Sequence, residues 1–153
     1  DHKQVQQIID IISEIRSFKN ELNVSPGSFI DISINSIKKN NQNFMINNEI
    51  IIKKLGRINN FYKKDQNKPA ASLIISGDLF KIYFDENVDL NAIKENLLKR
   101  QNKYQEEMDK ISQRLSNKGF VQRAPKDIVQ QEKTNYSNLK NDIKKISLTI
   151  ESL

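Results

Sequence analysis

The sequence has 153 residues, of which 37% are hydrophobic and 29% charged, and its formal net charge at pH 7 is +6. This length suits one ordinary domain, but so little apolar material argues against one compact globule and favours an elongated shape. The positive charge points to an anionic partner, and the absence of cysteine excludes disulfides and thiolate metal sites.

No apolar run approaches the roughly 20 residues that a membrane-spanning helix needs. The N-terminus also lacks the basic and apolar segments of a signal peptide. We therefore expect a soluble, cytoplasmic protein without membrane contact. Because the sequence begins at Asp1 and not at methionine, we also expect it to be part of a longer chain.

Residues 1–27 are predicted to form one amphipathic helix and its end. Proline cannot continue the hydrogen-bond ladder of a helix, so the stretch from Asn23 to Gly27 ends it. No second long helix follows at once, and we expect the apolar stripe to find its partner upstream, as the last helix of a bundle would. The stripe, spaced by three and four residues, consists of Ile8, Ile11, Ile15, Phe18 and Leu22.

Residues 28–87 are predicted to form a small α/β unit in the order β-α-β-β-β. Apolar and polar side chains alternate from Phe29 to Asn35, which is the period of a half-buried strand. Residues 36–55 predict a helix that ends at Gly56. Its expected buried residues are Phe44, Ile51 and Leu55.

Three further strands are expected in this unit. They cover residues 58–63, 71–76 and 79–84. Gly77 and Asp78 lie between the last two and suit a two-residue hairpin turn. We interpret the whole unit as a connector that orients its neighbours.

Residues 88–153 predict a long antiparallel coiled-coil hairpin. Asp89 suits the N-cap of the first helix, and Pro125 with Asp127 suits the first turn of the second. Two apolar seams of similar length, joined by a short turn, bury each other. The seams are Leu90, Ile93, Leu97, Tyr104, Met108, Ile111 and Leu115, and Val129, Tyr136, Leu139, Ile143, Ile146, Ile150 and Leu153.

The turn of this hairpin carries its own stop signal. Gly119 is predicted to take the left-handed position of a Schellman motif, which would fold Phe120 back on Leu115. The fold class predicted for the whole chain is therefore α+β: a helix end, a small β-α-β-β-β connector and a long helical hairpin.

The sequence contains few groups that could carry out catalysis. His2 is the only histidine, and no His, Cys or carboxylate pair has the spacing of a metal site. The four glycines form no phosphate-binding loop. We expect no catalytic residue, metal or cofactor within these residues.

Basic residues concentrate in the second half. Residues 1–88 carry 12 basic and 10 acidic side chains, against 13 and 9 in residues 89–153. Such clusters favour salt-sensitive, sequence-independent contacts with phosphates, although a solvated coiled-coil surface explains them equally well. The candidates are Lys110, Arg114, Lys118, Arg123 and Lys126 around the turn, and Lys94, Lys99, Arg100 and Lys103 near the base of the first helix.

The turn itself, from Leu115 to Pro125, has the sequence L-S-N-K-G-F-V-Q-R-A-P, and Val129 and Glu132 follow. It resembles the tip of the C-terminal coiled-coil arm of valyl-tRNA synthetases, L-S-N-x-G-F-V-x-x-A-P-x-x-V-V-x-x-E, with Ile128 in place of the first paired valine. Residues 15–26 are similar to the family's I-R-x-x-R-x-E-M-N-V-S-P segment, and residues 70–90 to the short sheet that leads into the arm.

The resemblance implies a class I ligase that joins valine to its tRNA with ATP and has an editing domain against mischarged threonine, all upstream of these residues. Residues 1–27 would end the anticodon-binding helical domain, 28–87 would be the connector, and 88–153 the arm that packs on the outer corner of tRNA-Val, where the D and T loops meet. ATP would be bound only by the parent enzyme, which we expect to be monomeric. The resemblance adds Arg16 and Lys19 to the tRNA-binding candidates, with Lys19 where the family usually has arginine.

Two other interpretations remain open at this point. A coiled-coil module of this kind can bind another protein through its polar faces, with its positive charge incidental. A basic hairpin can also bind RNA without regard to its shape, on the ribosome or elsewhere. The RNA-binding interpretation explains the hairpin but not the segments that precede it.

Overall fold

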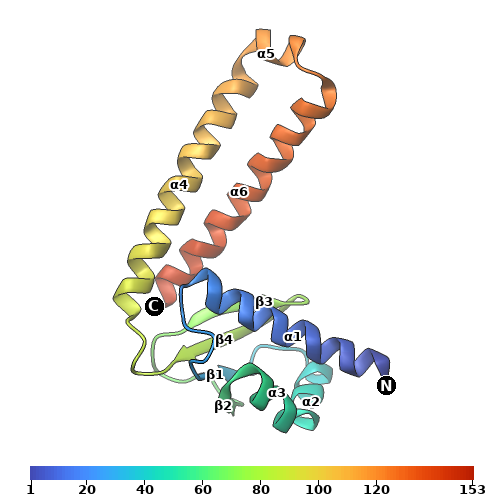
Figure 1. The fold of residues 1–153 in the computed structure, drawn as a ribbon, viewed down its shortest axis with the longest axis vertical. Helices are drawn as coiled ribbons and strands as arrows, with labels where there is room; N and C mark the ends of the chain where they lie inside the picture. Colours follow the sequence, from blue (N-terminus) through green and yellow to red (C-terminus); the bar gives the residue numbers. More distant parts are fainter. The chain divides into compact units, whose positions relative to one another are not determined.

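A computed structural model describes residues 1–153 (Figure 1). The elements in chain order are α1 (His2–Glu21), β1 (Ile30–Ser33), α2 (Lys39–Asn47), α3 (Glu49–Gly56), β2 (Ile58–Tyr62), β3 (Ala71–Ile75), β4 (Asp78–Phe84), α4 (Leu90–Ser116), α5 (Lys118–Arg123) and α6 (Lys126–Ser152). They fall into two compact units. The α/β unit comprises residues 1–93 and 152–153, and the hairpin unit comprises residues 94–151. The predicted α+β class is confirmed.

The α/β unit is built on a four-stranded sheet in the order β2-β1-β4-β3. β1 pairs in parallel with β2 and antiparallel with β4, which in turn pairs antiparallel with β3. Parallel neighbours need a crossover connection, and α2 with α3 supplies it between β1 and β2. All four predicted strands are therefore present.

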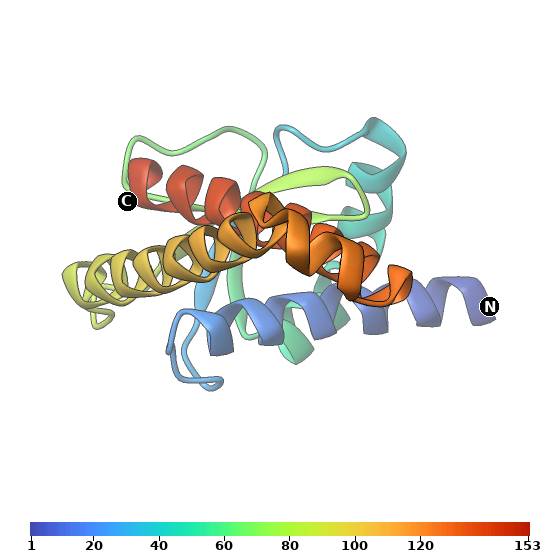
Figure 2. The ribbon, with the colours of Figure 1, turned by 90° about the horizontal axis from the view of Figure 1, so that it is seen from above.

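α1 buries its apolar stripe inside this unit, against α3 and β3. It runs as one uninterrupted helix (Figure 2), and the five predicted stripe residues are each between 2% and 8% exposed. The expectation that this stripe finds its partner upstream is therefore wrong, because the sheet and α3 already cover it. The assignment of α1 to an anticodon-binding domain, like the other predicted domain boundaries, stays a prediction.

The helix predicted over residues 36–55 is in fact two helices. It breaks at Asn48, whose φ is −114° and whose side-chain amide donates to the carbonyl oxygen of Phe44 at 2.9 Å. The predicted burial of Phe44, Ile51 and Leu55 is wrong, because in both helices the covered face lies one residue further along the chain. The fully covered residues are Met45 in α2 and Ile52 and Gly56 in α3.

Gly56 lies at a closely packed point and does not have a positive φ. A Cβ at this position would lie 3.0 Å from Cδ1 of Ile58 and 3.2 Å from Cδ1 of Ile12. The left-handed residue that ends α3 is Arg57, with φ of 55°. α1, α3 and β2 therefore pack closely at Gly56, and a side chain there would require Ile12 and Ile58 to shift.

The hairpin between β3 and β4 turns one residue earlier than predicted. Ser76 and Gly77 have φ of 52° and 83°, and both central residues of a type I′ turn require a positive φ. Asp78 pairs with Ile75 as the first residue of β4. Its buried carboxylate accepts hydrogen bonds from the backbone of Lys38 at 3.2 Å and from the side chain of Asn41, which fixes the start of α2.

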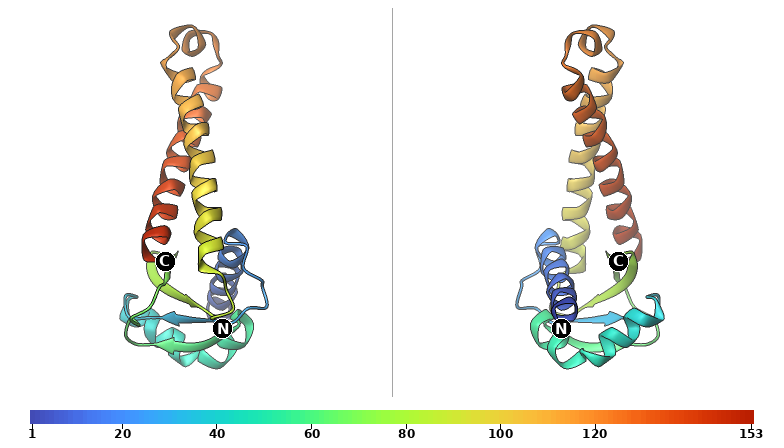
Figure 3. Two further views of the ribbon diagram at one scale, coloured as in Figure 1. Left: turned by 90° about the vertical axis from the view of Figure 1, so that its left-hand side faces the viewer. Right: turned by 90° about the vertical axis from the view of Figure 1, so that its right-hand side faces the viewer.

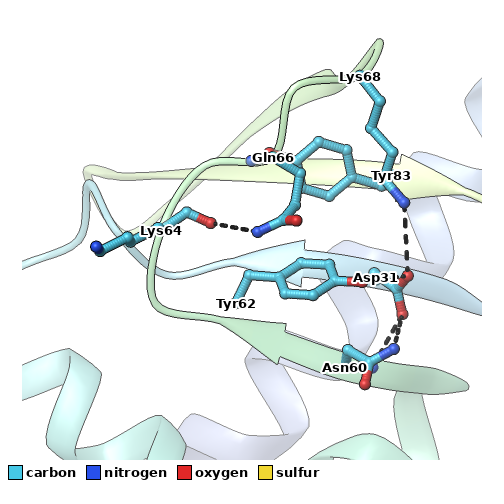
Figure 4. A network of polar contacts seen from close by, with 7 residues as sticks. All are labelled: Asp31, Asn60, Tyr62, Lys64, Gln66, Lys68 and Tyr83. Atoms are coloured by element: carbon cyan, nitrogen blue, oxygen red, sulfur yellow. Dashed lines mark hydrogen bonds and ion pairs between the residues drawn. The ribbon is translucent and has the colours of Figure 1, made fainter.

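The loop between β2 and β3 lies beside the sheet residues Asp31, Tyr62 and Tyr83 and makes a network of polar contacts with them (Figure 4). Asp31 accepts hydrogen bonds from the backbone and side-chain amide of Asn60, both at 3.0 Å, and lies 3.9 Å from the ammonium of Lys68. That ammonium also lies over the rings of Tyr62 and Tyr83. The loop is further tied to the sheet because the Tyr83 hydroxyl accepts from the backbone of Gln66 at 2.8 Å.

No helix in the structure combines the length and the apolar character that crossing a membrane requires.

Candidate nucleic-acid interface

The hairpin unit consists of α4 and α6 lying side by side, with the short α5 at their junction (Figures 1 and 3). Two polar contacts fix their register. The side-chain amide of Gln101 donates to the Ser147 hydroxyl at 2.6 Å. Nε and Nη2 of Arg114 donate to Oε2 of Glu132 at 3.0 and 2.8 Å.

The apolar seam of this hairpin is only partly covered. Met108, Ile111 and Ile146 are buried, whereas Tyr104, Tyr136 and Leu139 are half-buried. Two helices without a third layer leave one side of their seam in water, so much of the surface of the hairpin is available for contacts.

The junction differs from the predicted Schellman motif. α4 ends at Ser116, and Asn117 then caps α5 by accepting hydrogen bonds from the backbone of Gly119 at 3.0 Å and Phe120 at 3.2 Å. Gly119 has no positive φ, and a Cβ there would lie 3.2 Å from the capping oxygen of Asn117. The glycine therefore makes room for the cap, and the prediction that it ends the first helix in a left-handed conformation is wrong.

The predicted start of the first hairpin helix is confirmed, and the second begins directly after Pro125. The Asp89 carboxylate accepts from the backbone of Ala92 at 3.1 Å, as an N-cap does. The carbonyl of Pro125 accepts from the backbones of Ile128 and Val129 at the start of α6, and Asp127 lies in the first turn of that helix.

The five cations predicted around the turn are all exposed, although one of them is already paired. Arg114 is bound to Glu132, as described above. Lys110 precedes it on α4, Lys118 and Arg123 lie on α5, and Lys126 begins α6. A shallow hollow beside them is lined by Asn117, Gly119, Phe120, Arg123 and Ala124. The end of the hairpin thus presents positive charge around a partly apolar surface.

The second predicted cluster lies on α4 in the same unit. Lys99 and Lys103 are exposed, whereas Lys94 and Arg100 are half-buried. Arg16 and Lys19 belong instead to the α/β unit, on α1. The predicted site residues are therefore divided between the two units.

Lys19 lies inside the α/β unit and is 1% exposed. Its ammonium donates to the carbonyl oxygens of Ser28 at 2.6 Å, Gly56 at 3.3 Å and Pro26 at 3.5 Å. Burial, with smaller contributions from Arg57 and Arg16, lowers the pKa of Lys19 from 10.5 to about 8. A direct phosphate contact through Lys19 is thus contradicted, because its ammonium is buried and already donates to backbone carbonyl groups. Arg16, in contrast, is exposed.

The sequence pattern did not reveal the partner of Arg114, although the signal was present. Arg114 and Glu132 are equidistant from residue 123, and Gln101 and Ser147 are equidistant from residue 124. A hairpin folded about this point brings such positions together. Reading both seams outward from the turn would have predicted the pair.

A basic helical hairpin with exposed cations at its turn is the kind of surface that can contact a phosphate backbone. Residues 89–153 match the family model described as the valyl tRNA synthetase tRNA binding arm. The chain belongs to the valyl-tRNA synthetase family and corresponds to a C-terminal part of that enzyme.

Individual relatives agree with this assignment along nearly the whole chain. It is 71% identical to the valine–tRNA ligase of Pelagibacter ubique over 98% of its length. It is 29% identical to that of Bartonella quintana over 97% and 25% identical to that of Aquifex aeolicus over 100% of its length. The chain spans only 17%, 16% and 13% of these three relatives.

Proposed function

We propose that this chain holds tRNA-Val for a valyl-tRNA synthetase through the cations at the end of the helical hairpin. The observation that carries the proposal is the match of residues 89–153 to the tRNA-binding arm. The exposure of Lys110, Lys118, Arg123 and Lys126 in that segment supports it. In this proposal the upstream domains of the parent enzyme bind ATP and attach valine, in the cytoplasm.

The physical role of the hairpin is to supply affinity and register. α4 has 27 residues, which at a rise of about 1.5 Å per residue give a reach of roughly 40 Å. Phosphate contacts along such a length position an RNA without reading its sequence. The outer corner of the tRNA, where the D and T loops meet, offers a surface recognisable by shape, and the identity of the tRNA is read elsewhere.

Arg114 has a different role in this proposal. Because both of its donating nitrogens bind one oxygen of Glu132, it fixes the register of α4 and α6 beside the turn. Lys118, Arg123 and Lys126 provide the phosphate contacts.

A titration of fluorescently labelled tRNA-Val transcript at several salt concentrations tests the proposal. Reversal of Lys118, Arg123 and Lys126 to glutamate is expected to abolish binding, and the native chain is expected to lose affinity steeply as salt rises. The matched control reverses Lys38, Lys39 and Lys54, which are exposed in the α/β unit. Equal losses in both triple variants would reduce the effect to net charge and contradict the proposal.

A protein partner is the second candidate function. A hollow between the hairpin helices combines apolar Ile111 and Leu139 with charges of both signs, Lys110, Glu107 and Asp142 among them. Such a mixture suits a protein surface better than a phosphate backbone. Absence of tRNA binding even at low salt would favour this candidate.

A further inference from the structure

The ammonium of Lys19 joins three segments of the α/β unit. It reaches from α1 to the carbonyl oxygens of Ser28 and Gly56, at 2.6 and 3.3 Å. The residues that directly follow these two anchors are Phe29 and Arg57. The backbone of Ile30 also donates to the carbonyl oxygen of Arg57 at 3.0 Å, which ties the two segments together.

Phe29 and Arg57 form an exposed aromatic–guanidinium pair at this junction. The guanidinium carbon of Arg57 lies 5.6 Å from the centre of the Phe29 ring. Phe29 remains 39% exposed, and Arg57 is exposed as well. Arg57 holds a left-handed φ of 55°, a conformation that disfavours side chains other than glycine, asparagine and aspartate. The backbone of Arg57 is therefore strained in the conformation that places its side chain at the surface.

Two arginines lie close enough to Lys19 for their charges to act on its ammonium. The charges that act most strongly on Lys19 are those of Arg57 and Arg16, both of which lower its pKa. Like charges held close together repel each other, and a bound anion relieves the repulsion. Phe29 also lines a hollow that contains the carboxylates of Asp31, Asp85 and Glu86. These negative charges repel a phosphate, so a phosphate is favoured only on the side of Arg16 and Arg57.

We propose that Phe29, Arg57 and Arg16 form a second RNA contact, outside the hairpin, where an unstacked nucleobase stacks on Phe29 and its flanking phosphates bind the two arginines. Lys19 is the positioning residue of this contact, because it fixes the backbone before both Phe29 and Arg57. Aromatic stacking combined with arginine contacts is the general means by which proteins hold single-stranded RNA. The inference rests on the proposed function, namely that this chain binds RNA.

The variant that isolates the contact is Arg57→Gly. Glycine accepts a left-handed φ without strain, so the fold is kept or stabilised while the guanidinium is lost. Lys39→Ala, on α2, removes one exposed cation from the same unit and serves as the charge-matched control. Phe29→Ala tests the stacking itself, with thermal unfolding of each variant measured alongside.

The probes are a labelled tRNA-Val transcript and a labelled single-stranded RNA of twelve nucleotides that carries thiouridine for photo-crosslinking. We expect Arg57→Gly and Phe29→Ala to weaken binding of the single-stranded RNA about tenfold, and Lys39→Ala to change it less than twofold. The crosslinked peptide is expected to contain Phe29.

The outcomes separate this inference from the proposed function. Binding of tRNA that depends on the hairpin cations but is unchanged in Arg57→Gly and Phe29→Ala, without a crosslink at Phe29, overturns the second contact alone. Equal weakening by Lys39→Ala overturns it as well, because only diffuse charge is then involved. Absence of any RNA binding by the native chain overturns both. A labelled acidic peptide serves as a third probe. If Arg57→Gly and Phe29→Ala lose binding to this peptide while their RNA binding stays intact, the surface binds a protein and the inference is overturned.

Discussion

The two units of this molecule bury their apolar residues to very different degrees. In the α/β unit, Ile30, Ile32 and Ile34 of the first strand region are at most 2% exposed, because helices cover the face to which they point. In the hairpin unit, residues of the seam such as Tyr136 and Leu139 stay half-buried. The α/β unit therefore has a well-covered core, whereas the hairpin unit leaves more of its side chains accessible for contacts. This contrast agrees with a scaffold that carries an RNA-binding arm.

The contrast predicts unequal costs for the same kind of truncation. Ile32→Ala removes a fully buried side chain and is expected to lower the free energy of unfolding by about 3 kcal/mol. Leu139→Ala is expected to cost about 1 kcal/mol, since its side chain loses less buried contact. Urea denaturation followed by circular dichroism measures both values. Equal costs would mean that the hairpin has a core as complete as that of the sheet.

The capped turn of the hairpin is expected to matter next. Asn117→Ala removes the acceptor of two backbone hydrogen bonds and should cost about 1 kcal/mol. The loss should be local, so amide hydrogen exchange is expected to accelerate in residues 117–124 and to remain unchanged in the sheet. Asn117→Asp keeps the acceptor and is the control. Faster exchange throughout the sheet would show that the two units do not respond separately.

The Arg114–Glu132 pair should have a smaller effect, because it is partly exposed. A double-mutant cycle with Arg114→Ala and Glu132→Ala is expected to give a coupling energy of about 0.5 to 1 kcal/mol. High salt should weaken this coupling. A coupling of zero would remove the role of the pair in fixing the helix register.

Lys19 is expected to make the free energy of unfolding of the α/β unit vary with pH in the alkaline range. Its pKa is about 8 in the folded chain and near 10.5 when unfolded, so the unfolded chain holds more protons between these values. The free energy of unfolding should therefore rise as pH increases through this window, by linkage. Lys19→Met should remove that part of the slope. A slope of the same size in Lys19→Met would show that other groups cause it.

Most secondary structure of this chain could be predicted because it follows from periodicity along the sequence. The backbone conformations of single residues could not be predicted, because they do not follow from periodicity. Gly119 was expected to be left-handed, but the left-handed residues besides Gly77 are Asn23, Arg57 and Ser76. Gly56 and Gly119 both lie where an added Cβ atom would come close to a neighbouring side chain.

Which residues form the binding site stays a prediction, and only the exposure of the candidate residues can be compared with the structure. The cations near the turn are exposed as expected, because a polar residue off an apolar seam faces water. Lys19 was added to the candidates only through the family resemblance, and three backbone carbonyl groups from other segments enclose its ammonium. The contact between Phe29 and Arg57 was not predicted either, because it joins residues 28 positions apart.

Aminoacylation kinetics of the full-length synthetase test the central claim most directly. The reversal of Lys118, Arg123 and Lys126 to glutamate would be compared with the native enzyme, and valine-dependent ATP–pyrophosphate exchange would be measured beside it. If the hairpin holds the tRNA, the KM for tRNA-Val rises at least tenfold while the exchange rate stays nearly unchanged. A large loss of exchange, or an unchanged KM for the tRNA, would contradict the account.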